Sequence, residues 1–351
     1  MISDYLSVKL KVVSFLLMIL VVFIHSYNVN NSAVERESAV FLIESFLGAG
    51  LALIAVPLFF VISGYLFFLT FDGSYFKLWK KIEKRFSTLL LPFVFWAIFS
   101  VAIYLVIQTF PKFDHFFNQK LIKNFTIGEL FIKTFLDPFA YQLWFLRDLI
   151  VIIFFTPVIF WFLRLAPMLT ISISLIVWLL NLNLFVIYNG SLPFFLIGSW
   201  LGLTNKIKLD RLPAKVTSFA FGIWGAILLL MTYLISQDLD SIFQYNLIKN
   251  ISIVIGIFAF WGGYDLLFDL VSRRVKVLAP ITSFAFFLYG FHEPFLTFIK
   301  KVLFVVFGKE QLDYLLIYFL APIVVIFASL TVGFYTKKIL PKFYDAITGG
   351  R

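Results

Sequence analysis

The sequence predicts an all-α fold: a polytopic transmembrane helical bundle of about ten spans, with both termini cytoplasmic. Of its 351 residues, 62% are hydrophobic and only 14% are charged, whereas a soluble domain has about 45–50% apolar and about 25% charged residues. The apolar residues form long runs separated by short polar segments, and the basic residues favour alternate segments. These observations predict a single transmembrane domain over residues 1–351, surrounded by the lipid bilayer.

The predicted spans are apolar runs, because a helix needs about 20 such residues to cross the hydrocarbon core. The runs are 8–27, 50–71, 87–109, 143–163, 168–188, 191–204, 214–235, 247–268, 281–306 and 314–336. The first is followed by His25-Ser26-Tyr27-Asn28 and not by a small-residue cleavage site, which predicts a retained span and not a signal peptide. An apolar piece from Ala39 to Gly50 carries Glu44, and we expect it to be a re-entrant or interfacial helix.

The basic residues predict the orientation of these spans. If both termini are inside, the inner segments contain roughly twice as many basic residues (Lys and Arg) as the outer loops, as the positive-inside rule requires. The residues then assigned to outer loops are Arg36, Lys112, Lys120, Lys123, Lys133, Lys249, Lys300, Lys301 and Lys309. The net charge of +10 is therefore typical of a membrane protein, and no nucleic-acid partner is expected. The absence of cysteine excludes disulfides and thiolate catalysis.

Five ionisable residues inside predicted spans are functional candidates, because such groups are costly to bury in a membrane. They are His25, Arg147, Asp148, His292 and Glu293. A helical rise of about 1.5 Å per residue places them all in the outer half of the bilayer, which predicts one polar cluster. Histidine can act as a general base near neutral pH. The alternatives are an interfacial His25 and a snorkelling Arg147–Asp148 pair, and no ligand spacing supports a metal site.

Two basic features point toward the cytoplasmic side. Lys11, Ser14 and His25 lie on one face of the first helix, because eleven residues advance by close to three full turns. A dense basic cluster on an inner loop comprises Lys77, Lys80, Lys81, Lys84 and Arg85. This cluster fits either an anchor on anionic lipid or a site for a cytosolic phosphate-bearing ligand, with Arg85 pairing bidentately with phosphate.

Six motifs occur in a characteristic order. They are VVFIHSYN, VPLFFVISGYLFF, KKIEKRFSTLLLPFVFW, LWFLRDLIV, LPFFLIGSWLG and FAFFLYGFHEPF. Together they resemble the acyltransferase-3 family of bacterial integral membrane acyltransferases (O-acetyltransferase-like), over residues 8–345. The resemblance implies transfer of an acyl group, usually acetyl, from cytosolic acyl-CoA to a hydroxyl of a cell-surface glycan or its lipid-linked precursor. It further implies location in the bacterial cytoplasmic (inner) membrane, with acyl-CoA as co-substrate and no permanently bound cofactor.

The resemblance also implies roles for individual residues. His25 corresponds to the presumed catalytic histidine. The residues expected to bind acyl-CoA are Lys11, Ser14, Lys81, Lys84 and Arg85. Those expected to bind or orient the acceptor are Trp144, Arg147, Asp148, His292 and Glu293. Family members commonly have an arginine eleven residues before the histidine, where this chain has Ser14, and Lys11 is the candidate to replace its charge.

Two other functions fit parts of the pattern. A non-enzymatic transporter or flippase for a glycolipid would explain the intramembrane polar residues but not the basic cluster on the inner side. A polysaccharide polymerase or ligase would need larger outer loops than the segment 110–140 provides. The sequence does not indicate the acceptor, the acyl chain or the oligomeric state.

Overall fold

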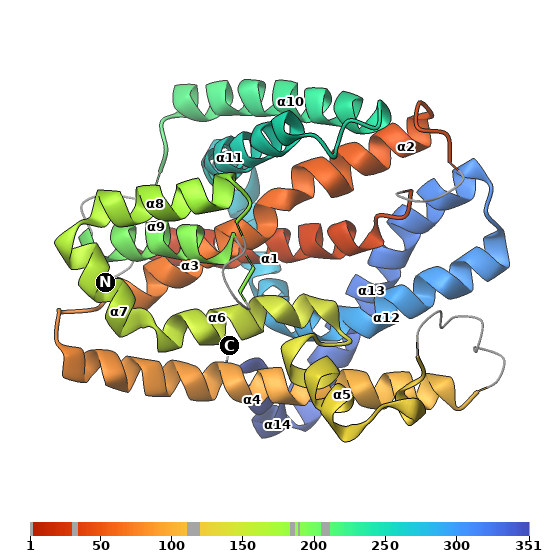
Figure 1. The fold of residues 1–351 in the computed structure, drawn as a ribbon, viewed down its shortest axis with the longest axis horizontal. Coiled ribbons are helices and arrows are strands. Elements are labelled where there is room, and N and C mark those ends of the chain that lie inside the picture. The colour runs from red at the N-terminus through yellow and green to blue at the C-terminus, as the bar shows by residue number, and fades with distance from the viewer. Residues whose placement is uncertain are drawn as a thin grey trace.

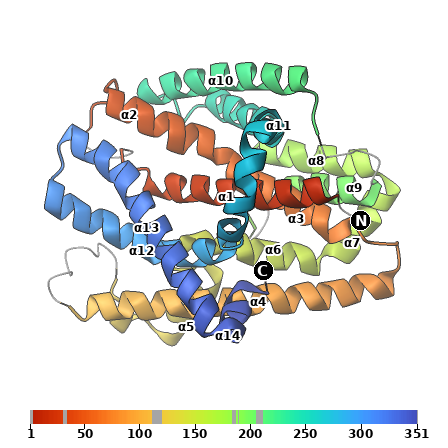
Figure 2. The ribbon, with the colours of Figure 1, turned by 180° about the vertical axis from the view of Figure 1, so that it is seen from behind.

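The computed structural model describes residues 3–29, 34–110, 120–182, 187–188, 190–204 and 211–350, and it describes their side chains except those of 269–279. All the regular elements in these ranges are helices, which confirms the predicted all-α fold. Figure 1 shows most of them running side by side along the long axis, with α1 (Asp4–Ser26) in the interior. Figure 2, from behind, shows α11 (Phe243–Thr282) crossing over α1.

The helices follow one another along the chain with short connections, and the η elements are π-helical or 3₁₀ turns. After α1 come α2 (Ala39–Glu44), η1 (Ser45–Gly50), η2 (Leu51–Ile54), α3 (Ala55–Phe68), α4 (Tyr75–Gln108), η4 (Ile122–Asn124), α5 (Ile127–Phe131), η5 (Ile132–Leu136), η6 (Tyr141–Leu143) and α6 (Trp144–Phe154). The second half contains α7 (Thr156–Leu165), α8 (Pro167–Leu179), α9 (Ser191–Thr204), α10 (Ala214–Ser236), α11 (Phe243–Thr282), α12 (Ala285–Phe307), α13 (Gln311–Ile339) and α14 (Pro341–Thr348).

Six helical segments of the described chain are long and apolar enough to cross a membrane. They are Asp4–Ser26, Ala39–Phe68, Tyr75–Gln108, Ala214–Ser236, Phe243–Phe268 and Gln311–Ile339, with α6 and α7 a seventh if this bent pair is one span. The other expected spans correspond to the shorter apolar helices α8 and α9 and to α12, which is interrupted at Glu293 (φ −108°, ψ 136°). The chain is therefore a polytopic membrane protein, for which ten spans is an approximate count.

α1 occupies the interior because almost its whole circumference is apolar. The Ser3 hydroxyl accepts a hydrogen bond from the Leu6 N–H and caps its start, which satisfies one of the free donors of the first turn. Leu17 and Val22 are fully buried. Because α1 packs against α3, α11, α12 and α13, its last turn holds His25 among several helices.

The segment 39–50 differs from the interfacial helix expected from the sequence. It continues through η1 and η2 into α3, so that Ala39–Phe68 forms one candidate span of 30 residues. The buried Glu44 is accommodated because its Oε2 accepts a hydrogen bond from the Asn28 N–H at 2.9 Å. Gly48 lets the helix approach Tyr27 closely, since a Cβ there would lie 3.2 Å from the Tyr27 side chain.

The predicted run 143–163 is broken and not straight. α6 and α7 meet at an angle of 63°, next to Pro157 in the first turn of α7. Proline has no N–H to donate and restricts the residue before it, so a continuous helix is disfavoured there. The run 168–188 is also shorter than expected, because α8 ends at Leu179. Residues 183–186 of this run and residues 111–119 of the predicted loop 110–140 lie outside the described chain.

Helices α3 and α9 pack through glycine, as membrane helices often do. A Cβ on Gly198 would lie 2.0 Å from the Val61 carbonyl oxygen. We therefore expect Gly198→Ala to destabilise the protein by about 1–3 kcal/mol through overpacking, measured as a lower thermal unfolding midpoint in detergent. The control is Gly225→Ala on α10, where a Cβ meets nothing within 4 Å. Equal midpoints for the two variants would contradict the expectation.

Candidate active site

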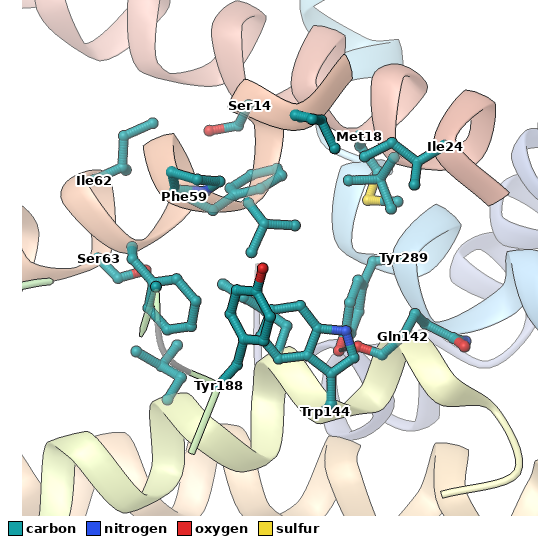
Figure 3. Close-up of a pocket in the computed structure, with 18 of the residues that line it drawn as sticks. Ser14, Met18, Ile24, Phe59, Ile62, Ser63, Gln142, Trp144, Tyr188 and Tyr289 are labelled. Atoms are coloured by element: carbon teal, nitrogen blue, oxygen red, sulfur yellow. Dashed lines mark hydrogen bonds between the residues drawn. The ribbon is translucent and has the colours of Figure 1, made fainter. Parts of the chain in front are cut away.

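A cavity of about 960 Å³ lies among the helices. It follows α1 from Leu10 to His25, a length of about 22 Å at 1.5 Å per residue. Figure 3 shows its walls, with Ser14 contributed by α1, Phe59 by α3 and Trp144 by α6. Most lining side chains are apolar, so a long, thin and largely apolar ligand fits this space.

The ionisable side chains that line the cavity are basic. They are Lys11, His25, Arg85, Arg147 and Lys249, and no Asp or Glu lines it within the described part of the chain. A charge pattern of one sign in a low-dielectric cleft attracts ligands of opposite charge. The cavity is therefore suited to anionic ligands.

Lys11, Ser14 and Arg85 lie at the end of the cavity near the start of α1 and α4. The predicted polar stripe on α1 is therefore present, because Lys11, Ser14 and His25 all face the same space. Among residues with described side chains, the Arg85 guanidinium makes no hydrogen bond or ion pair. Arg85 is half-buried, so its planar fork is available to a phosphate group.

The rest of the basic cluster does not reach the cavity lining. Lys81 Nζ donates to the Phe67 carbonyl (2.7 Å) and to Thr70 Oγ1 (3.0 Å), which ties the end of α3 to α4. Lys84 is exposed. Lys77 forms an exposed ion pair with Asp72, and its hydrogen bond lowers the pKa of that carboxyl. Of the predicted acyl-CoA ligands on α4, only Arg85 lies at the cavity.

His25 lies at the other end of the cavity, in the last turn of α1. Its ring is nearly parallel to that of His292, with centroids 5.5 Å apart, and nearly perpendicular to that of Tyr141, with centroids 4.6 Å apart. His292 is fully buried behind His25, where its Nδ1–H donates to the Leu288 carbonyl at 3.1 Å. Of the two imidazoles, His25 is the one that lines the cavity and can meet a substrate.

Glu293 is buried beside the histidine pair at the break in α12. Its Oε1 accepts a hydrogen bond from Tyr141 Oη at 2.9 Å, and its backbone carbonyl accepts one from Gln142 Nε2 at 3.3 Å. Tyr289 Oη in turn donates to the Gln142 carbonyl at 2.9 Å. These bonds connect η6 to α12 and hold Tyr141 against His25.

Lys300 completes this group, although the sequence assigned it to an outer loop. It lies within α12, and its Nζ donates to the His25 carbonyl oxygen at 2.8 Å. Its charge also interacts with the carboxylates of Glu293 and Glu44. The missed signal is that Lys300 lies seven residues after Glu293, close to two helical turns, within an apolar run.

Arg147 and Asp148 form a second polar group and do not join the histidines as the sequence predicted. Asp148 is fully buried, and its Oδ1 accepts bonds from Arg147 Nε (3.0 Å) and Nη2 (2.8 Å). Its Oδ2 accepts from the Tyr188 N–H (2.6 Å) and Ser191 Oγ (2.9 Å). Asp148 therefore fixes the segment before α9, and the buried carboxylate excludes a merely snorkelling pair.

Trp144 lies beside this pair and places its ring in the cavity wall, where it contacts the ring of Tyr188 with centroids 4.9 Å apart. Both rings are visible in Figure 3. In the described chain no group of three or more His, Cys, Asp or Glu side chains could hold a metal ion. The cavity therefore has a basic end with Lys11 and Arg85 and, toward its other end, the imidazole of His25.

The comparisons with known proteins confirm the family that the sequence motifs predicted. Residues 9–336 match the acyltransferase domain of the acyltransferase-3 family. The chain is also 25% identical over 314 residues to the succinoglycan biosynthesis protein ExoH of Rhizobium meliloti (strain 1021), covering 87% of this chain and 81% of that protein. No solved structure matches the chain significantly. Because the match extends over most of its length, the chain belongs to the acyltransferase-3 family of membrane acyltransferases.

Proposed function

We propose that the protein transfers an acyl group from cytosolic acyl-CoA to a hydroxyl of a cell-surface glycan or its lipid-linked precursor. The observation that carries the proposal is a single cavity with Arg85, which has no partner among the described side chains, at one end and His25 at the other. Coenzyme A has anionic phosphates at one end and a slender arm ending in sulfur at the other, which matches this order of charge and apolar wall.

His25 is the general base in this mechanism. It takes the proton of the acceptor hydroxyl while the oxygen attacks the carbonyl carbon of the thioester. The tetrahedral intermediate collapses as the carbon–sulfur bond breaks, and the thiolate leaves and receives the same proton back from His25. The products are the ester and free coenzyme A, so that no proton is gained or lost overall. His292 would support the His25 ring by stacking on it, and Lys300 would hold the His25 backbone through its carbonyl oxygen.

The acceptor would enter from the outer end of the cavity, where Trp144 and Arg147 lie. A glycan acceptor is supported by the similarity to a protein named for succinoglycan biosynthesis. If the donor is cytosolic and the glycan acceptor lies on the opposite side of the membrane, that membrane must border the cytoplasm. We place the enzyme in the bacterial cytoplasmic membrane for this reason, with acetyl as the acyl group that the family resemblance favours.

Arg85→Gln tests the donor site. We expect the KM for acetyl-CoA to rise about tenfold or more, because a hydrogen bond to a charged group is worth about 1.5–3 kcal/mol, while kcat changes little. Stabilisation of the purified protein by coenzyme A, measured as a shift in the thermal unfolding midpoint, should weaken in parallel. The matched control is Lys84→Gln, an exposed neighbour on the same helix, which should leave both measurements near those of the parent.

Two results would contradict this assignment. Equal KM values for the Arg85 and Lys84 variants would remove Arg85 from the donor site. A parent protein that coenzyme A does not stabilise at all would favour the alternative, a glycolipid transporter, because such a protein has no use for the nucleotide.

A further inference from the structure

One face of α11 carries three polar residues into a wall that is otherwise mostly apolar. Asn246, Lys249 and Asn250 all line the cavity, and their spacing of three and four residues places them on one side of the helix. All three belong to the first turns of α11 (Phe243–Thr282). The sequence had assigned Lys249 to an outer loop, so none of the three had a functional interpretation.

The Asn250 side chain is buried but not bonded. Its residue is 6% exposed, and its amide makes no hydrogen bond to any described residue. Buried polar side chains are nearly always hydrogen-bonded in proteins, because leaving one unpaired is costly. An amide that faces a cavity and lacks a protein partner is therefore placed to bond to a ligand.

The Lys249 ammonium is only partly satisfied. Its Nζ donates to Asn246 Oδ1 at 2.8 Å, and it forms no ion pair with a carboxylate of the described chain. An ammonium has three donors, so it has further donors for a ligand. Arg147, another cation that lines the cavity, is paired with the buried Asp148 at 2.8 Å. The Lys249 charge interacts with the Asp240 carboxylate without an ion-pair contact, so its ammonium remains available to a ligand.

Position separates this group from the donor end. Lys249 lies in the second turn of α11, whereas Asp265, sixteen residues or about 24 Å further along the same helix, is bonded to Lys9 near the start of α1. Lys11 and Arg85 lie at that inner end, near the starts of α1 and α4. A ligand bound by Lys249 therefore approaches His25 from the side opposite to the basic inner mouth.

We propose that Asn246, Lys249 and Asn250 form a subsite for an anionic oxygen group carried by the acceptor, either a phosphate or a sugar carboxylate. The ammonium pairs with the charge, and the Asn250 amide donates to an oxygen of the same group. The proposal rests on the proposed acyl transfer, because it assigns this end of the cavity to the acceptor. It adds a requirement for negative charge that the transfer chemistry itself does not have.

Binding to the purified protein in lipid nanodiscs tests the subsite without acyl donor. Two matched pairs of probes distinguish a phosphate from a sugar carboxylate. Farnesyl phosphate is compared with farnesol, and methyl glucuronide is compared with methyl glucoside. The signal is the fluorescence of tryptophan, since Trp144 and Trp178 line the cavity. We expect at least one anion to bind the parent protein about tenfold more tightly than its neutral partner, and the pair that does so identifies the source.

Three variants test whether Lys249 causes the preference for the anionic probe over its neutral partner. Lys249→Met should remove it, and Lys249→Arg should keep it within about threefold because the charge remains. Lys309→Met, the same change at an exposed outer residue, should leave it unchanged. The unfolding midpoint of each variant without probe, and its coenzyme A affinity, should match the parent's.

The subsite is overturned if neither anion is preferred by the parent, or if Lys249→Met retains the preference. It is also overturned if Lys249→Met weakens coenzyme A binding as much as anion binding, since Lys249 would then belong to the donor site. Because no transfer is measured, a failure here leaves the proposed transfer standing. Conversely, a failure of acyl transfer with the anion preference intact would separate the subsite from the reaction.

Discussion

His25→Ala should lower the rate of acyl transfer by about 10²–10⁴-fold, which is the range expected for loss of a general base. The change removes the imidazole that lines the cavity and leaves the Arg85 end untouched. The KM for acetyl-CoA and the stabilisation by coenzyme A should therefore stay near the values of the parent. The measurement is transfer of radiolabelled acetyl from acetyl-CoA by the purified protein to glycan extracted from the producing cells.

His292→Gln is the matched comparison for this prediction. His292 has the same side chain and lies 5.5 Å from His25 between ring centroids, but it is fully buried and does not line the cavity. Its loss should slow transfer less than the loss of His25 does, because it acts through the position of the other ring. If the His25 variant transferred at the parental rate, the proposed mechanism would be wrong; if the His292 variant were the more damaged, the base would be His292.

Lys9→Met should lower the free energy of unfolding by about 3–5 kcal/mol, the usual effect of removing one partner of a buried ion pair. Lys9 Nζ lies 2.8 Å from Asp265 Oδ2, with the two side chains 0% and 5% exposed. Asp265 also accepts a bond from the Leu212 N–H at 2.9 Å, and Lys9 Nζ lies 4.3 Å from the ring centroid of Trp261. The pair joins α1 to α11.

The double variant Lys9→Met with Asp265→Asn distinguishes this pair from simple loss of packing. Removing both charges should recover part of the stability lost in Lys9→Met, because no unpaired charge remains buried. Unfolding is followed by circular dichroism during titration with denaturing detergent. Additive losses in the double variant would show that the two charges do not stabilise each other.

The fold class was predictable because it depends on the number of apolar residues and their runs. The helical face of α1 was predictable for the same kind of reason, since the spacing of Lys11, Ser14 and His25 depends only on helical geometry. All three line the cavity. Local periodicity therefore identified the cavity wall that α1 provides.

Contacts between distant segments could not be read from local spacing. Lys9 and Asp265 are 256 residues apart, and nothing in either segment indicates their pairing. Lys300 was assigned to a loop because charged residues near the end of an apolar run usually mark a membrane boundary, whereas here the His25 carbonyl accepts a bond from its ammonium. The grouping of Asp148 with the histidines failed similarly, because equal depth in a membrane does not imply contact.

The length of α4 bears on which part of a bound acyl-CoA would lie in water and which part would lie in the apolar interior of the membrane. Its 34 residues extend for about 51 Å, about 20 Å more than the hydrocarbon core is thick. The charged first turns, which include Lys84, cannot lie in hydrocarbon without cost, so they extend into water at the inner face. A nucleotide held at Arg85 would stay hydrated while only its slender thioester arm enters the apolar interior. In the proposed mechanism the acyl group alone would then cross the bilayer, and no polar carrier would have to be translocated with it.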